Sequence, residues 1–245
     1  MKNRLKTEFL EKNKVSATTF EILAFRAVDH PDLCQEYVKG HVNVLKDYGV
    51  TSVKSSNPTW TKNPFAYCIV AVRDNEMLGG IRIHKAHPDY ILPMEEGVSR
   101  MDPKVTIEIN RNILEGCGEQ CGLWNSKVIS GYGISWILVN ASIAILPQLG
   151  IKKLFGLASD YSMFLFSPAG FEIQKQFGKN GDFNYPTEKY IARVVIIENC
   201  TELTSSDEKE REFVFMLREN PNMKGQIVVN QLKLDLTFKL KLDDE

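Results

Sequence analysis

One stretch in the middle of the chain places a strand, a glycine-containing loop and an apolar helix in direct succession, which indicates a fold that mixes strands and helices. Residues 119–124 (EQCGLW) are predicted to be a strand and residues 125–133 a loop. The apolar run 134–146 is 13 residues long, short of the ~20 needed to cross a bilayer. We therefore predict a buried helix over residues 134–149, ended by Gly150.

The loop before that helix has the composition of an anion site. Its last six residues are VISGYG, with glycine at 131 and 133. Glycine lets successive N–H groups point at one anion, and the helix N-terminus adds partial positive charge. The alternative is that both glycines only permit a tight turn. A nucleotide phosphate loop is disfavoured, because there is no Gly-Lys-Ser/Thr ending and no third glycine at dinucleotide spacing.

Around this unit, apolar periodicity predicts strands and helices that alternate along the chain. The strands are expected at 20–28, 65–72, 77–85, 153–158 and 190–197. Helices are expected at 32–48, 103–114, 160–167 and 205–218, and a loop at 51–64. Mixed strand pairing with helices on both faces of the sheet is an α/β (α+β) architecture.

The last segment of the chain alternates with a period of two. Leucine or phenylalanine occupies every second position from 232 to 242, with polar residues between them. Such a pattern predicts a half-buried strand, whose partner is either the main sheet or another subunit in a homodimer. We predict a main domain over residues 1–200 and a helix–strand extension over 201–245.

The charge balance restricts the partners. With 30 basic and 31 acidic residues the net charge is −1, which gives no long-range attraction for nucleic acid or anionic lipid. Residues 1–14 are charged and lack the apolar core of a secretory signal. The five cysteines are odd in number and scattered, which favours reduced thiols and a cytoplasmic protein. Cys117 and Cys121 have no second pair at zinc-finger spacing, so no metal is expected.

Residues 115–175 resemble the core of the GCN5-related N-acyltransferase (GNAT) superfamily. The motifs that carry the resemblance are the pair Gly131/Gly133, the helix exit Leu149-Gly150-Ile151 and the closing Gly170-Phe171. The order of the preceding hairpin, residues 65–85, also matches. More loosely, the chain resembles the larger acyltransferases that place long acyl chains on amino-acid-like amines.

The resemblance implies a mixed, mostly antiparallel sheet that binds an acyl donor. The donor would be acyl-coenzyme A or an acyl-carrier protein, and the acceptor a small amine. Donor-binding residues are then expected at the strand end and along the loop. They are Leu123, Trp124, Val128, Ile129, Ser130, Gly131, Tyr132, Gly133, Ile134 and Ser135.

Two departures from the family pattern affect the chemistry. Val128 stands where the family has Arg or Gln, and Phe166 where a tyrosine often protonates the departing thiolate. Tyr161, or Ser162, is the candidate substitute for that acid. Glu119 is the candidate base, since deprotonating an amine is commonly the work of a carboxylate. Its alternative is a solvated carboxylate at a strand end.

Apolar and aromatic residues are candidates for the walls on both sides of the site. Leu123, Trp124, Phe155, Gly156 and Leu157 are predicted to wall the donor cleft, with plain core packing as the alternative. Trp60, Tyr67, Tyr90 and Tyr185 are candidates for the acceptor side. Two other hypotheses remain open: a non-catalytic member of this fold that binds a ligand or partner, and a dimerisation protein that pairs through residues 232–242.

Overall fold

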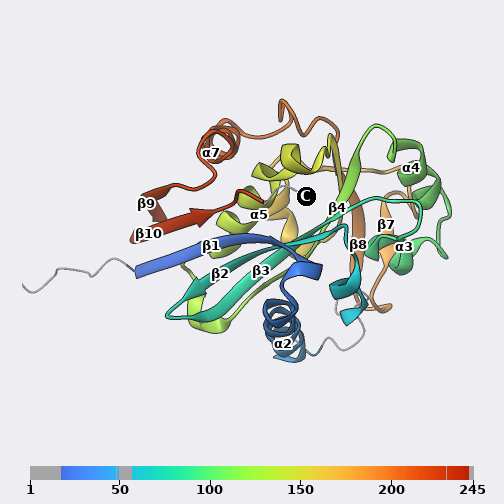
Figure 1. Ribbon diagram of the computed structural model, residues 1–245. Coiled ribbons are helices and arrows are strands. Elements are labelled where there is room, and N and C mark those ends of the chain that lie inside the picture. Colours follow the sequence, from blue (N-terminus) through green and yellow to red (C-terminus); the bar gives the residue numbers. More distant parts are fainter. Residues whose placement is uncertain (1–17, 48, 50–56, 230, 243–245) are drawn as a thin grey trace, which may run out of the picture.

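A computed structural model describes residues 18–47, 49, 57–229 and 231–242 (Figure 1). Within these residues ten strands form one mixed sheet, in the order β6-β8-β5-β4-β3-β2-β1-β10-β9, with β7 also paired to β8. The strands are β1 (Thr18–Arg26), β2 (Ala66–Arg73), β3 (Glu76–Lys85), β4 (Cys117–Asn125), β5 (Lys153–Ser159), β6 (Glu172–Ile173), β7 (Asp182–Asn184), β8 (Ile191–Ile197), β9 (Lys224–Val229) and β10 (Leu232–Lys239).

Helices cover both faces of the sheet, as the apolar patterns predict. The α-helices are α2 (Pro31–Asp47), α3 (Pro93–Val98), α4 (Lys104–Asn112), α5 (Ile134–Ala144), α6 (Met163–Phe166) and α7 (Glu208–Glu219). Short 3-10 helices are η1 (Ala27–Asp29), η3 (Pro58–Lys62), η4 (Lys127–Ile129), η5 (Leu146–Leu149) and η6 (Asp160–Ser162). No helix among the described residues is long and apolar enough to cross a membrane.

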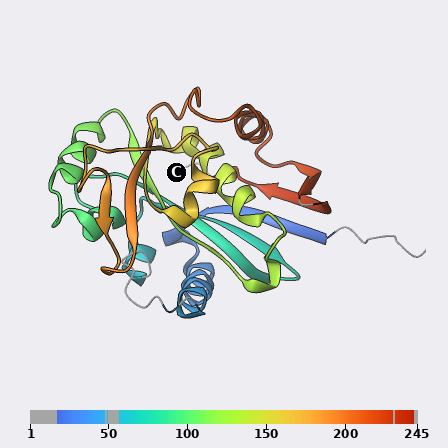
Figure 2. The same cartoon turned by 180° about the vertical axis from the view of Figure 1, so that it is seen from behind.

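The central strands β2 and β3 lie between two helical layers. Helix α5 packs on one face and α2 on the other (Figures 1 and 2). The first six residues of β2 are buried, and this explains why residues 65–72 form an unbroken apolar run. Helix α3 and the strand β9 were not predicted. The helix predicted over 134–149 is shorter: α5 ends at Ala144, and Pro147 leads the chain into η5.

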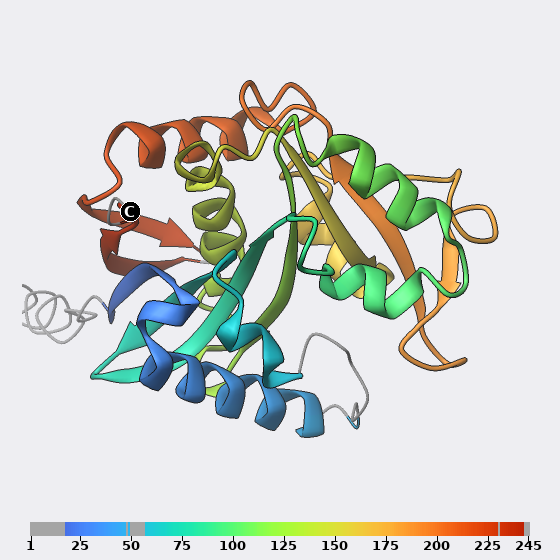
Figure 3. The same ribbon diagram turned by 45° about the vertical axis from the view of Figure 1, so that its right-hand side comes forward.

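Strands β4 and β5 pair over only part of their length. Their parallel ladder runs from Cys117 opposite Lys153 to Gln120 opposite Gly156, and both strands continue beyond it without pairing to each other. Figure 3 shows the two strands diverging. A shift in the β3–β4 register accompanies the divergence, where Gly122 has a φ of 66°. The register shift marks a β-bulge. The hydroxyl of Tyr37 on α2 donates to the Gly122 carbonyl (2.5 Å) and holds this bulge in place from the α2 face of the sheet.

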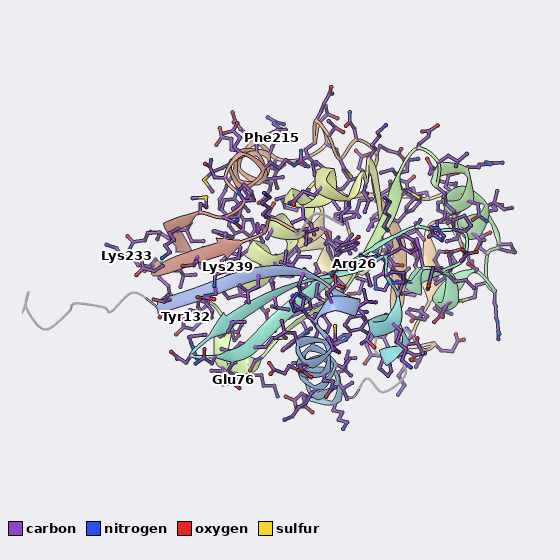
Figure 4. All side chains as sticks on the ribbon, viewed as in Figure 1. Arg26, Glu76, Tyr132, Phe215, Lys233 and Lys239 are labelled. Atoms are coloured by element: carbon purple, nitrogen blue, oxygen red, sulfur yellow. The ribbon has the colours of Figure 1, made fainter. Side chains whose placement is uncertain are left out.

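The C-terminal segment joins the same sheet. β10 pairs in parallel with β1 and antiparallel with β9, so the alternating strand has partners on both sides and β9 is the edge. Lys239, labelled in Figure 4, forms an ion pair with Glu21 of β1 (2.9 Å). The hypothesis of dimerisation through an exposed strand 232–242 is therefore wrong for β10, because its hydrogen-bonding edges are already used within the chain.

Helix α7 fixes this extension to α5. The Asn140 side chain donates to the Glu210 carboxylate (2.6 Å) in a buried contact, and the rings of Trp136 and Phe213 stack at 4.6 Å. The described residues between 201 and 242 thus extend the main sheet and pack on its central helix. The division of the chain at residue 200 stays a prediction.

Candidate functional site

A polar pocket of about 380 Å³ opens on the α2 side of the sheet, between η3, the end of β3 and the start of α3. It is lined by Asn57, Thr59, Trp60, Lys62, Asn63, Arg82, His84, Asp89, Tyr90, Ile91, Pro93 and Glu96. Two of these, Arg82 and His84, project from the middle of the sheet and are fully buried. A pocket of this size takes a small molecule.

Glu119 lies next to the pocket, at the point where β4 and β5 diverge. It is one residue before the last β4–β5 pair and directly opposite His84 of β3. Residues directly opposite in an antiparallel pair share one face of the sheet. The Glu119 carboxylate is 2% exposed and accepts a hydrogen bond from the backbone N–H of Met94 (2.8 Å).

Burial determines the protonation of this carboxyl group. Desolvation raises the pKa of Glu119 to about 8, against the hydrogen bond from Met94 and the positive charge of Arg82, which lower it. The negative charges of Glu95 and Glu96 contribute to the same rise, and about 8 is the pKa that results from all of these causes. A carboxyl group with a pKa near the working pH is suited to accept a proton and release it again. The hypothesis of a solvated strand-end carboxylate is therefore wrong.

Arg82 brings a positive charge to the same wall. Its guanidinium carbon lies 4.1 Å from the ring centroid of Trp60 and 5.5 Å from that of Tyr37. Its Nη2 also donates to the Cys121 thiol (3.6 Å). The two aromatic rings hold the guanidinium flat by cation–π contact. The arrangement presents a positioned cation to whatever enters the pocket.

The predicted donor loop leads into α5 as expected, but its side chains divide into two groups. Trp124, Ile129 and Ile134 are buried, and the Trp124 indole packs against Tyr37. These three side chains belong to the core, so the prediction that they contact the donor is wrong for the side chains. Only their backbone atoms remain candidates for donor contacts. The other candidates, Leu123, Val128, Ser130, Gly131, Tyr132, Gly133 and Ser135, keep some exposure.

Close packing requires glycine at one of the two loop positions and not at the other. Both have a left-handed backbone, with φ of 83° at Gly131 and 71° at Gly133. A Cβ on Gly133 would lie 2.3 Å from Cγ1 of Val229 on β9, so close packing accounts for glycine there. A Cβ on Gly131 would meet no described atom within 4 Å. Packing therefore does not require glycine at 131, and that position is open on its outer side.

The candidates for proton donor to the thiolate lie beyond the end of β5. Tyr161 is 80% exposed, with its ring 6.3 Å from that of Phe164. The Ser162 hydroxyl donates to the Ser159 carbonyl (2.9 Å) in a local turn. Phe166 packs against Phe171 in the core. Tyr161 is thus the more accessible of the two hydroxyls.

Of the four aromatics predicted on the acceptor side, Trp60 and Tyr90 line the pocket. Tyr67 points to the opposite, α5 side of the sheet, and Tyr185 packs near Gly97 of α3, so neither is among the residues that line this pocket. Among the donor-cleft walls, Phe155 is buried in the core beside α3 and α4, while Leu157 is half-buried.

Sequence reasoning missed Arg82 and His84 as site residues. Their signal was present in β3: two polar residues at i and i+2 occupy one face of the sheet, within a segment, residues 77–84, that is otherwise apolar and buried throughout. Among the described residues, no three His, Cys, Asp or Glu side chains gather in a way that would hold a metal ion.

A second, larger hollow of about 820 Å³ lies along the outer face of α2. Its described lining includes Lys39, Lys46 and Lys62 but no carboxylate or imidazole. Carboxylate and imidazole groups are found instead at the smaller pocket beside Glu119, which is therefore the better candidate site.

Comparison with known proteins places the fold. No protein-family model and no curated protein matches the chain. Among solved structures, FeeM, an N-acyl amino acid synthase from uncultured soil microbes, matches 79% of this chain and 97% of its own at 14% identity, with a TM-score of 0.59. The chain has the GCN5-related N-acyltransferase fold.

Two further structures with the GNAT fold agree. The AHL synthase LasI matches 77% of this chain and 93% of its own at 12% identity, with a TM-score of 0.56. The CoA-dependent acyl-homoserine lactone synthase BjaI, solved with SAM and isopentyl-CoA, matches 82% and 90% at 12% identity, with a TM-score of 0.53. The fold predicted from residues 115–175 is confirmed.

Proposed function

We propose that this protein transfers an acyl group from a thioester, carried by coenzyme A or by an acyl-carrier protein, to a small amine. The position of Glu119 carries the proposal. It places a buried carboxyl group with a raised pKa between a polar pocket and the divergence of β4 and β5. A carboxyl group so placed is able to serve an amine on one side and a thioester on the other.

The reaction follows from these groups. The free amine nitrogen of the acceptor attacks the thioester carbonyl carbon, and the Glu119 carboxylate takes the proton that this nitrogen loses as the amide forms. The carbon–sulfur bond then breaks, and the departing thiolate takes up a proton and leaves as a thiol. The exposed hydroxyl of Tyr161 is our candidate source of that proton, since the ring of Phe166 has none to give.

The donor is expected to lie along the unpaired ends of β4 and β5. Backbone N–H groups that no neighbouring strand occupies are able to polarise a thioester carbonyl, and the ladder between β4 and β5 ends at Gln120 and Gly156, before either strand ends. The pyrophosphate of coenzyme A would then lie at the loop 128–133 and the N-terminus of α5, with exposed Gly131 allowing close approach.

Arg82 narrows the acceptor to an amine that also carries a carboxylate, an amino-acid-like molecule. A guanidinium binds a carboxylate through paired hydrogen bonds, and its burial strengthens the attraction. The indole of Trp60 and the ring of Tyr90 form apolar parts of the same wall. The similarity to FeeM supports this class of acceptor.

Thiol release tests the function. Acyl-CoA thioesters of several chain lengths, and in a separate arm an acylated carrier protein, are incubated with the protein and a mixed library of amines and amino acids. Amine-dependent release of free thiol, with the amide found by mass spectrometry, is the expected result. Donor binding without release for any amine would favour the non-catalytic hypothesis, for which buried Phe166 is the supporting observation. No binding of any donor would contradict both.

A pair of glycine variants tests the donor loop. Gly131→Leu is expected to weaken acyl-CoA binding at least tenfold in isothermal titration, because a side chain there projects where the diphosphate would approach. Gly150→Leu is the matched control: Gly150 also has a positive φ, 66°, and open space around its Cβ position, at the other end of the α5–η5 segment. Equal losses in the two variants would mean that backbone strain, not a donor contact, is responsible.

A further inference from the structure

His84 is a buried polar residue that the reaction outlined above does not use. Its side chain is 1% exposed, and neither Nδ1 nor Nε2 has a hydrogen-bond partner among the described residues. Buried polar groups in folded proteins are almost always hydrogen-bonded, since leaving one unsatisfied costs stability. An imidazole held in this way inside a strand needs a reason beyond packing.

The surroundings of His84 indicate a ligand. It lines the 380 Å³ pocket together with Arg82, two residues away on the same face of β3. Directly across the ladder lies Glu119 on β4. The imidazole is therefore a neighbour of both the cation that we assign to the acceptor's carboxylate and the carboxyl group that we assign as base.

The imidazole is neutral in this position. Burial, and next the positive charge of Arg82, hold the pKa of His84 well below its usual range. A neutral imidazole has one N–H donor and one unprotonated nitrogen that accepts. The accepting nitrogen is the kind of partner that an amine N–H requires, and Arg82, a donor only, cannot supply it.

We propose that His84 is a substrate-positioning residue that accepts a hydrogen bond from the acceptor amine. With one N–H held by His84 and another by the Glu119 carboxylate, the nitrogen lone pair is left to point at the thioester carbon. This inference rests on the proposed function for the identity of the amine, but the pocket and the unpartnered imidazole are independent of it.

Two variants of His84, with a control at His41, separate a positioning role from a packing role. His84→Leu is expected to lower kcat/KM for the amine by about 10- to 100-fold, the worth of one lost hydrogen bond in a desolvated site, with acyl-CoA affinity unchanged. The same variant is expected to unfold at a higher urea concentration than the wild type, because it removes a buried group that has no partner. His84→Gln, which keeps an accepting atom, should recover part of the activity. His41→Leu removes another buried histidine, which does not line this pocket, and should leave kcat/KM unchanged.

A binding measurement needs no turnover. With ¹⁵N-labelled histidine, the His84 ring signals are followed while L-phenylalanine, phenethylamine or 3-phenylpropanoate is added. We expect the larger shifts with the first two compounds, which carry an amine, and smaller ones with the third, whose carboxylate binds Arg82 alone. Shifts that require the carboxylate but not the amine, no shift with any of the three, or wild-type kinetics in His84→Leu would each overturn the proposal. Amine-dependent shifts in a protein that releases no thiol would contradict only the proposed function.

Discussion

Replacing Glu119 by glutamine is expected to lower kcat/KM for the amine by about 10²–10⁴-fold, the usual worth of a general base. Glutamine has the same shape and keeps an oxygen for the N–H of Met94, so acyl-CoA affinity should not change. The matched control is Glu210→Gln, which alters another buried carboxylate, on the far helix α7, that accepts a hydrogen bond from Asn140 of α5. A loss below tenfold in Glu119→Gln, or an equal loss in the control, would remove Glu119 from the mechanism.

The pH dependence of the wild type follows from the same group. Because the base is the carboxylate, kcat/KM should rise as the pH rises through about 8. Stability should change in the opposite direction. The folded-state pKa is raised, so the stabilising contribution of the neutral carboxyl group is complete below the unfolded pKa of about 4.3 and is lost as the pH rises through about 8. Glu119→Gln should not show this loss, and urea unfolding of both proteins across that window measures the difference.

Replacing Arg82 by methionine is expected to abolish selectivity for acceptors that carry a carboxylate. The ratio of kcat/KM for L-phenylalanine to that for phenethylamine should fall by about 30-fold or more, since a desolvated charge pair is worth ~2–5 kcal/mol. Methionine keeps much of the apolar stem that packs on Trp60.

The control for Arg82 is another arginine held over aromatic rings. Arg73 lies 5.5 Å from the ring centroid of Phe20 and 6.0 Å from that of Tyr132, outside the pocket. Arg73→Met should leave the ratio unchanged. A wild-type protein that prefers phenethylamine, or an Arg82→Met variant with the wild-type ratio, would contradict the assignment of Arg82 to the carboxylate.

The sequence alone determined those parts of the protein that depend on local patterns. The apolar run in 65–72 predicted a strand buried on both faces, and the period of two in 232–242 predicted a half-buried strand. The glycines and apolar helix of residues 125–149 predicted a strand-to-helix turn, apart from the early end at Ala144. These features are fixed by neighbours within a few residues, so a linear pattern contains them.

The tertiary structure alone decided which residues meet. β10 lies between β1 and β9, and His84 faces Glu119, because strand order and register join segments far apart in the chain. Trp124 and Ile129 looked like donor contacts by position but lie in the core. The sequence left Glu119 either a base or a solvated carboxylate, and the packing of α3 over it decided that it is buried. Its pKa, like the arrangement of Arg82 and His84 around the pocket, depends on desolvation by distant residues, which no local pattern in the sequence records.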